Sequence, residues 1–305
     1  MPGQGIDIRD RARGGLFDQP YLLLSLTSLF WAGNTVLGRY IAGHVPPITL
    51  AFIRWGGAFL IVLPFAAPYL VRDWPVIRKH AGLMIVFALT GVSAYNAAAY
   101  YGLQYTTAIH GLLLQSVTPL FVALWTFVLF GERLSRRQTG GILISLTGVM
   151  IIVCQGSLAV LLGVDFNRGD LAFLIALLIY AFYTAWLRKR PAMHPLSFLA
   201  AGMGLGAILL LPGVAWEIAT GATFILDTVS VATFVYVCVF PSLLGYLCLN
   251  RGIELVGANR AAPFIHLVPV FGSLLAIALL GEHFELYHAV GYALVFSGIT
   301  VATRK

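Results

Sequence analysis

The stretch HLVPVFGSLLAIALLGEHFE (residues 266–285) repeats the layout of SVTPLFVALWTFVLFGERLS (residues 116–135). Both place a proline, Pro119 or Pro269, ahead of a long apolar run that closes on Gly-Glu. Other residues recur at the same separation of 150 positions: Gly102 and Gly252, Ala108 and Ala258, Gly131 and Gly281, Glu132 and Glu282, Gly141 and Gly291, and Gly148 and Gly298. One unit of about half the chain is therefore present twice.

The overall composition excludes a protein surrounded by water. Of the 305 residues, 59% are hydrophobic and 10% are charged, and the mean hydropathy is +0.89. Soluble domains carry roughly 25% charged residues, so this chain has too few to cover a water-facing surface. We therefore expect an integral membrane protein. The cysteines Cys154, Cys238 and Cys248 lie in apolar runs, without the spacing of a disulfide framework or a metal site.

Ten apolar segments are long enough to cross a bilayer as helices, which takes roughly 20 residues each. The predicted spans are about 21–42, 48–70, 81–102, 107–130, 138–155, 170–188, 196–213, 228–250, 259–280 and 286–303. Glycine, proline and charged clusters separate them. The predicted fold class is an all-α integral membrane protein with ten transmembrane helices.

The distribution of lysine and arginine predicts the orientation, because these residues concentrate in cytoplasmic loops. With the N-terminus inside, the cytoplasmic segments hold Arg9, Arg11, Arg13, Arg72, Arg78, Lys79, Arg133, Arg136, Arg137, Arg188, Lys189, Arg190, Arg251, Arg260, Arg304 and Lys305. The outer segments hold Arg39 and Arg168, and Arg54 lies within a span. This asymmetry indicates that both termini are cytoplasmic. It also explains the net charge of +7 without a nucleic-acid partner.

Each copy of the repeat contains five spans, an odd number, so the second copy should lie upside down in the membrane. The expected organisation is a cytoplasmic tail (1–20), a first five-helix repeat (21–155), an outer connecting loop (156–169) and a second five-helix repeat (170–305). Glu132 should then face the cytoplasm and Glu282 the exterior. Inverted repeats are typical of transporters, in which two half-bundles rock around a site near the middle of the membrane.

Four motifs carry a resemblance to a known family. They are FWAGNTVLGRY (30–40), YYGLQYTTA (100–108), TPLFVALWTFVLFGERLS (118–135) and LNRGIELVGANRAAPFIHLVPVFGSLLAIALLGE (249–282). Together they resemble the EamA-type exporters of the drug/metabolite transporter superfamily, and most closely the bacterial subgroup that exports aromatic and other neutral amino acids. The resemblance implies a 5+5 inverted-repeat bundle in the bacterial inner membrane that moves small metabolites outward.

The charged residues that the spans lack indicate the class of substrate. A charge at the bilayer centre is costly, and no Asp, Glu or Lys lies deep in a span. Related exporters of cationic drugs use a membrane-buried glutamate, whereas the first span here offers Asn34 and Thr35. A phosphorylated substrate would call for central Lys or Arg, and Arg54 is expected near the outer end of its span. A neutral or zwitterionic substrate fits best.

Candidate substrate-binding residues are polar or aromatic groups on consistent helix faces. They are Trp31, Asn34, Tyr95, Asn96, Gln115, Thr118, Tyr180, Tyr183, Tyr246 and His266. For each, a hydrogen bond between helices is the alternative role. Pro119 and Pro269 remove a backbone hydrogen bond in midspan, so each is either a fixed kink or a hinge whose freed carbonyl could accept an ammonium group.

These residues suggest a pocket for an amino acid. Its carboxylate would meet donors such as Asn34, Gln115 and Tyr95, and its ammonium group the carbonyls freed near the two prolines. Arg54 is expected to extend toward the outer interface, with an alternative role as an electrostatic guide for a carboxylate. Tyr100 is expected in an interfacial aromatic belt.

The sequence favours facilitated or gradient-driven efflux by alternating access, because proton antiport usually needs an intramembrane Asp or Glu. Broad-specificity drug efflux by proton antiport is the main alternative, with His266 as the deep titratable candidate. A channel and an intramembrane enzyme are more distant alternatives, and no enzymatic activity is expected. The expected partners are a small-molecule substrate and the lipid bilayer, without a cofactor, a metal or nucleic acid; a monomer is compatible with the sequence.

Overall fold

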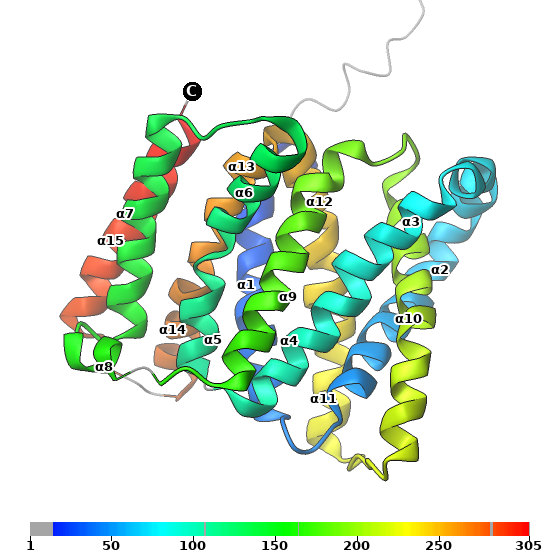
Figure 1. Cartoon of the computed structure of the whole chain (residues 1–305), viewed down its shortest axis with the longest axis horizontal. Coiled ribbons are helices and arrows are strands. Elements are labelled where there is room, and N and C mark those ends of the chain that lie inside the picture. The colour runs from blue at the N-terminus through cyan, green and yellow to red at the C-terminus, as the bar shows by residue number, and fades with distance from the viewer. Residues whose placement is uncertain (1–14, 107, 164, 281–282, 305) are drawn as a thin grey trace, which may run out of the picture.

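The computed structural model describes residues 15–106, 108–163, 165–280 and 283–304, and within these ranges every regular element is a helix. The helices form a bundle in which α1 begins, and α15 ends, at the same end of the molecule (Figure 1). The segments around residues 78, 190 and 260, each of which contains an arginine, also lie at this end, which we call the basic end. Predictions for residues 1–14, Gly281, Glu282 and Lys305 fall outside the described residues.

The elements of the first half are η1 (Leu16–Asp18), α1 (Pro20–Tyr40), α2 (Pro47–Lys79), α3 (Ala81–Ala88), η2 (Leu89–Ser93), α4 (Ala94–Tyr105), α5 (Ala108–Gln115), α6 (Thr118–Phe130) and α7 (Arg136–Val153). The short helix α8 (Leu158–Leu162) follows. The second half contains α9 (Arg168–Trp186), η3 (Leu187–Lys189), α10 (Pro195–Ala219), α11 (Thr228–Val237), η4 (Cys238–Leu244), α12 (Gly245–Val256), α13 (Ala258–Ala261), η5 (Ala262–His266), α14 (Leu267–Leu280) and α15 (Leu286–Thr303).

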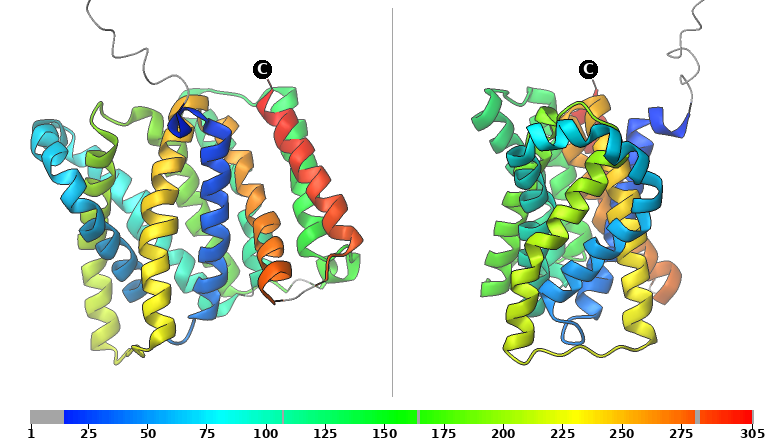
Figure 2. Two further views of the ribbon diagram at one scale, coloured as in Figure 1. Left: turned by 180° about the vertical axis from the view of Figure 1, so that it is seen from behind. Right: turned by 90° about the vertical axis from the view of Figure 1, so that its right-hand side faces the viewer.

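Eight helices of the described chain are long and apolar enough to cross a membrane. The helix α7 and the segment 258–280 do not belong to this set. The predicted end of the second span near residue 70 is wrong, because α2 continues to Lys79 with Pro64, Pro68 and Pro75 inside it. Proline bends a helix without ending it when neighbouring turns hold it, and the last part of α2 turns aside at the basic end (Figure 2).

The helices pack in pairs that follow the sequence repeat. The helix α7 lies against α15, α2 against α10, α1 against α12, and α4 against α9 (Figure 1). The α7–α15 pair has its backbones in contact: a Cβ at Gly141 would lie 2.5 Å from the carbonyl oxygen of Gly298, and one at Gly298 would lie 2.4 Å from the amide nitrogen of Ser145. Small residues permit this approach, as in other membrane helix pairs.

Buried carboxylates close the ends of helices. Glu217, near the end of α10, accepts hydrogen bonds from the amides of Ile48 and Thr49 at the start of α2, both at 2.8 Å. Asp73 on α2 accepts one at 2.8 Å from the amide of His194, which precedes α10. The two helices therefore cap each other, and the cost of burying each carboxylate is offset by amide donors that would otherwise lack acceptors.

Both halves of the chain interrupt their helices at matching places. A π-helical stretch, η2 in the first half and η4 in the second, lies between two α-helical pieces. A second interruption separates α5 from α6, and a 3₁₀ segment, η5, precedes α14. Such interruptions free carbonyl groups, and π-helical turns are frequent at functional sites.

Candidate functional site

Three cavities follow one another through the middle of the bundle. The first, which we call the vestibule, has a volume of about 450 Å³ and lies at the basic end, lined among others by Arg190, Asn250 and Glu254. It shares Thr184 and Ile253 with a central cavity of about 30 Å³. The central cavity in turn shares the Trp31 side chain with a third cavity of about 20 Å³ that contains Arg54, here called the arginine cavity.

Arg54 extends from the third turn of α2 into a cluster of uncharged polar groups. Its Nε donates to Ser242 Oγ at 2.6 Å, and its Nη1 donates to Asn96 Oδ1 at 2.9 Å. Nη1 also lies 3.1 Å from the Tyr100 hydroxyl and 3.3 Å from Asn34 Oδ1. The guanidinium is 4.8 Å from the centre of the Trp55 ring, and Arg54 is only 2% exposed.

The surroundings of Arg54 contradict two expectations. The side chain does not extend to the outer interface, and Tyr100 is buried, with its hydroxyl donating to Asn34 Oδ1 at 2.9 Å, instead of belonging to an aromatic belt. Within the described ranges, ion pairs with Asp or Glu involve other basic residues and not Arg54. The cavity therefore contains a buried positive charge that is hydrogen-bonded but not neutralised.

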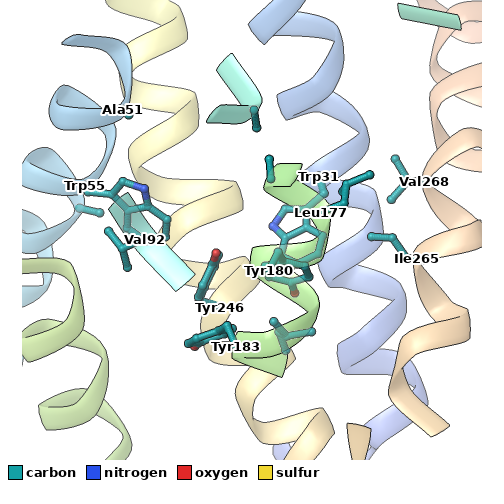
Figure 3. Packing of buried hydrophobic residues seen from close by; sticks show 14 of the residues in the cluster. Trp31, Ala51, Trp55, Val92, Leu177, Tyr180, Tyr183, Tyr246, Ile265 and Val268 are labelled. Atoms are coloured by element: carbon teal, nitrogen blue, oxygen red, sulfur yellow. The ribbon is translucent and has the colours of Figure 1, made fainter. Parts of the chain in front are cut away.

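An aromatic cluster separates the arginine cavity from the basic end. The Trp31 ring meets Tyr180 at 5.4 Å and Tyr246 at 6.0 Å between ring centres. Trp55 lies edge-on to Tyr246 at 4.9 Å, and Tyr183 lies 5.9 Å from Tyr246. Figure 3 shows these five rings gathered in one band between α1, α2, α9 and α12. Offset and edge-on contacts of this kind are the favoured ones for aromatic side chains.

The aromatic cluster is anchored on the two π-helical stretches. The Tyr246 hydroxyl donates to the carbonyl of Gly91 in η2 at 2.6 Å, and Trp31 Nε1 donates to the carbonyl of Pro241 in η4 at 3.2 Å. A side chain at Gly91 would clash, because its Cβ would lie 2.4 Å from the Tyr183 ring. The rings that divide the cavities are thus held by the irregular backbone of both halves of the chain.

The vestibule differs in its charges. Arg190 lies 3.3 Å from Glu254, Arg251 lies 3.4 Å from the same carboxylate, and Arg188 pairs with Glu132. On its inner side, the Tyr183 hydroxyl donates to Asn250 Oδ1 at 3.0 Å. Positive and negative groups alternate here, so the opening is polar but close to electrically balanced.

The structure brings most of the predicted binding residues to this line of cavities. Trp31, Asn34, Tyr95, Asn96 and Gln115 line the arginine cavity, and Trp31, Thr118 and Tyr180 line the central one. Tyr183 and Tyr246 belong to the aromatic cluster. Tyr100 and Ser242 were missed as members of the site, and Arg54 was considered only as a guide for a carboxylate near the outer interface. The available signal was Arg54 itself, a basic residue several positions inside the predicted span 48–70.

His266 is not brought to any of the three cavities. It is fully buried, with Nδ1 2.6 Å from the Ser145 hydroxyl and Nε2 2.8 Å from the Ser116 carbonyl. The two contacts fit a neutral imidazole that donates from Nε2 and accepts at Nδ1. This histidine therefore joins α7 to the break between α5 and α6, and it has the position of a packing residue.

The predicted prolines begin helices and do not bend continuous ones. Pro119 lies in the first turn of α6, and Pro269 near the start of α14. Proline is readily accommodated in a first turn because the amide there needs no partner. Of the carbonyls that the prolines free, the one of Gln115, four residues before Pro119, accepts a hydrogen bond from the Thr118 hydroxyl at 2.6 Å. A contact between the freed carbonyls and an ammonium group stays a prediction.

A multi-helix bundle that is apolar outside and encloses a line of polar cavities is the architecture of a membrane transporter. The sequence matches the model of the EamA-like transporter family twice, at residues 19–154 and 167–304. The chain therefore belongs to the EamA-like transporter family, as a multi-pass membrane transporter and not an enzyme.

Individual relatives agree with this assignment. The chain is 27% identical over 290 residues to the "Uncharacterized transporter YyaM" of Bacillus subtilis, with 93% of each chain covered. It is 25% identical over 295 residues to a "Probable amino-acid metabolite efflux pump" of Salmonella typhimurium, covering 92% of this chain and 93% of that one. A solved crystal structure has the same fold, with a TM-score of 0.74, 19% identity, and coverage of 93% of this chain and 96% of that chain.

Proposed function

We propose that the protein exports small neutral or zwitterionic metabolites, above all amino acids, across the bacterial inner membrane by alternating access. The observation that carries this proposal is the line of three cavities between the two halves of the chain. Among the described residues, the side chains that line the central and arginine cavities include no carboxylate. A cationic drug would lack a counter-charge there, whereas an amino acid brings charges of both signs.

The paired packing supports an inverted repeat of five helices in each half. The helices α7 and α15 begin 150 residues apart and run antiparallel side by side (Figure 1). The reciprocal capping of α2 and α10 is what a two-fold axis in the membrane plane would produce. We further propose ten spans and a cytoplasmic basic end, because basic residues favour the cytoplasmic side.

Transport through this line of cavities requires one end to close while the other opens. The vestibule is open at the basic end, while the arginine cavity leaves space for about one water molecule. Cargo would enter from the cytoplasm, displace the Trp31 ring that divides the inner cavities, and leave when the two repeats rock to open the opposite end. The interruptions η2 and η4 lie next to the moving ring and are the expected points of bending.

The amino-acid assignment draws on the site and on a relative. The arginine cavity combines a cation, amide groups and aromatic rings, which together suit a carboxylate, an ammonium group and a side chain. The Salmonella relative, named as an amino-acid metabolite efflux pump, supports the same class.

The test is flux in proteoliposomes loaded with unlabelled L-phenylalanine or L-leucine and supplied with the radiolabelled form outside. Saturable counterflow that persists without a pH gradient is expected. Linear flux would indicate a channel, and counterflow of cationic dyes that depends on a pH gradient, without amino-acid flux, would favour proton-coupled drug export instead.

The repeat can be tested separately by labelling from each side. Single cysteines replacing Glu132 and Glu285, in a chain whose Cys154, Cys238 and Cys248 are changed to alanine, should react with an impermeant maleimide from opposite compartments. Reaction of both from the same side would overturn the inverted arrangement.

A further inference from the structure

We propose that Arg54 binds a free carboxylate of the cargo while the Gln115 side-chain oxygen accepts a hydrogen bond from its ammonium group, so that a free carboxylate is obligatory for binding. The inference rests on the proposed function only in assuming that cargo passes through the arginine cavity. It adds the two groups that recognise the cargo and a chemical requirement that the cargo must meet.

The donors of Arg54 are unequally used. Its Nε and Nη1 groups donate to the protein, through Ser242, Asn96 and their neighbours. Nη2 has no acceptor in the described part of the chain. Because the Arg54 side chain lines the cavity, Nη2 is available to a ligand there. A guanidinium with its Nε and Nη1 fixed by the protein is pre-organised, so little further entropy is lost when Nη2 binds a carboxylate oxygen.

The charge balance points to an anionic ligand. Leaving a buried cation without a counter-ion is strongly unfavourable, and neutral acceptors and the Trp55 ring reduce this cost without removing the charge. A buried carboxylate could equally stabilise an arginine that had only a structural role. This fold does use buried carboxylates at helix ends, where Glu217 and Asp73 accept hydrogen bonds from backbone amides. At Arg54, the described residues provide neutral hydrogen-bond acceptors and no carboxylate.

Gln115 provides the second contact. Its side chain is 5% exposed and lines the arginine cavity, yet its Oε1 has no hydrogen-bond partner among the residues that the structure describes. A buried acceptor left unsatisfied is unfavourable, and a donor on the ligand would remove this cost. Ammonium is the donor that accompanies a carboxylate in an amino acid.

The walls of the cavity indicate where the rest of the cargo lies. Trp31 and Tyr95 line it, and Tyr180 contacts both, edge-on to the Trp31 ring at 5.4 Å and tilted against the Tyr95 ring at 4.8 Å between ring centres. With its charged end on Arg54 and Gln115, an amino acid would direct its side chain toward these rings and the central cavity. The present volume is too small for this, so binding must shift the Trp31 ring.

The experiment measures ligand binding by the purified full-length chain in detergent, from the ligand-dependent rise in Tm or the change in tryptophan fluorescence. The probes are matched pairs: L-phenylalanine with L-phenylalaninamide, and L-leucine with L-leucinamide. Each amide keeps the side chain and the ammonium group and lacks only the carboxylate. The acid of at least one pair should bind about tenfold tighter or more, as expected for a hydrogen bond to a charged group.

Substitutions then assign the contacts. Arg54→Gln should bring the ratio of acid to amide affinity close to one, and Arg136→Gln, at an exposed arginine, should leave it unchanged. L-phenyllactate has a hydroxyl in place of the ammonium group of L-phenylalanine. Gln115→Leu should reduce the ratio between the affinities for L-phenylalanine and L-phenyllactate relative to wild type. If Arg54→Gln does not fold, Arg54→Lys retains the charge and should still lower the ratio, because the planar fork of donors is lost.

The outcomes separate this inference from the proposed function. If no acid of the panel binds more tightly than its amide, the inference is overturned, even where amino acids are exported. If acids bind selectively and no export is observed, the carboxylate site stands and the proposed transport cycle fails.

Discussion

The two ends of the cavity line hold arginines in opposite circumstances. In the vestibule, Arg190 and Arg188 each have a glutamate as partner, and those glutamates, Glu254 and Glu132, are 44% and 46% exposed. In the arginine cavity, Arg54 is 2% exposed, and its partners within the described ranges are neutral. The arginines that water can solvate are thus paired with glutamates, whereas the arginine that is nearly shielded from water is not paired with an anion.

This difference assigns the two regions different tasks. Exposed ion pairs contribute little free energy, because water and salt screen them. A buried, pre-organised cation interacts strongly with any anion that reaches it, since the surrounding dielectric constant is low. The vestibule should therefore admit cargo with little selectivity, and the arginine cavity should select it.

The largest effect should come from removing the unbalanced charge. Arg54→Gln is expected to lower amino-acid counterflow about 100-fold, since losing one member of a buried charge pair costs 2–5 kcal/mol. The measurement is initial flux in proteoliposomes, normalised to folded protein. Arg136→Gln serves as the matched control, and equal flux in both variants would remove the distinction between the two regions.

A buried carboxylate at a helix end should matter for stability and not for selectivity. Glu217→Gln leaves the amides of Ile48 and Thr49 without a charged acceptor and is expected to lower stability by about 1–2 kcal/mol. The decrease in Tm measures this effect, while the preference for acid over amide should not change. A changed preference would place Glu217 in contact with the selective cavity.

The boundary between the regions should give an intermediate effect. Tyr183→Phe removes the hydroxyl that donates to Asn250 at 3.0 Å, beside the vestibule. A buried neutral hydrogen bond contributes about 1 kcal/mol, so a change of about fivefold in the maximal rate of flux is expected. Tyr40→Phe, at a tyrosine that is 65% exposed, provides the control. A loss as large as that of Arg54→Gln would show that selection begins at this boundary.

The smallest effect should come from the vestibule. Glu254→Gln breaks the contacts to Arg190 and Arg251, and the flux is expected to change by no more than about twofold, in line with the 0–1 kcal/mol of exposed pairs. Any difference from wild type should shrink as the ionic strength rises. A salt-independent loss of tenfold or more would mean that the vestibule also selects cargo.

The sequence alone was sufficient for the class of fold and the helical segments. Membrane spans are continuous apolar stretches, and charges at their ends are local features, so the starts of the eight long apolar helices of the described chain could be predicted to within a few residues. The repeat was visible because its two copies share residues at one fixed separation. Even so, the length of α2 was missed, since its prolines and charges are typical of a loop.

The selective cavity was decided by the tertiary structure. Arg54 and Ser242 are 188 positions apart, and Arg54 and Asn96 are 42 apart, so nothing local in the sequence relates them. Whether an arginine reaches lipid headgroups or a buried amide depends on what packs against its helix. The same holds for His266, whose partners on α7 and before α6 turned a titratable candidate into a packing residue. Hydrophobicity is a property of each stretch of chain and sets where the helices are, whereas the environment of a polar side chain exists only once those helices are packed.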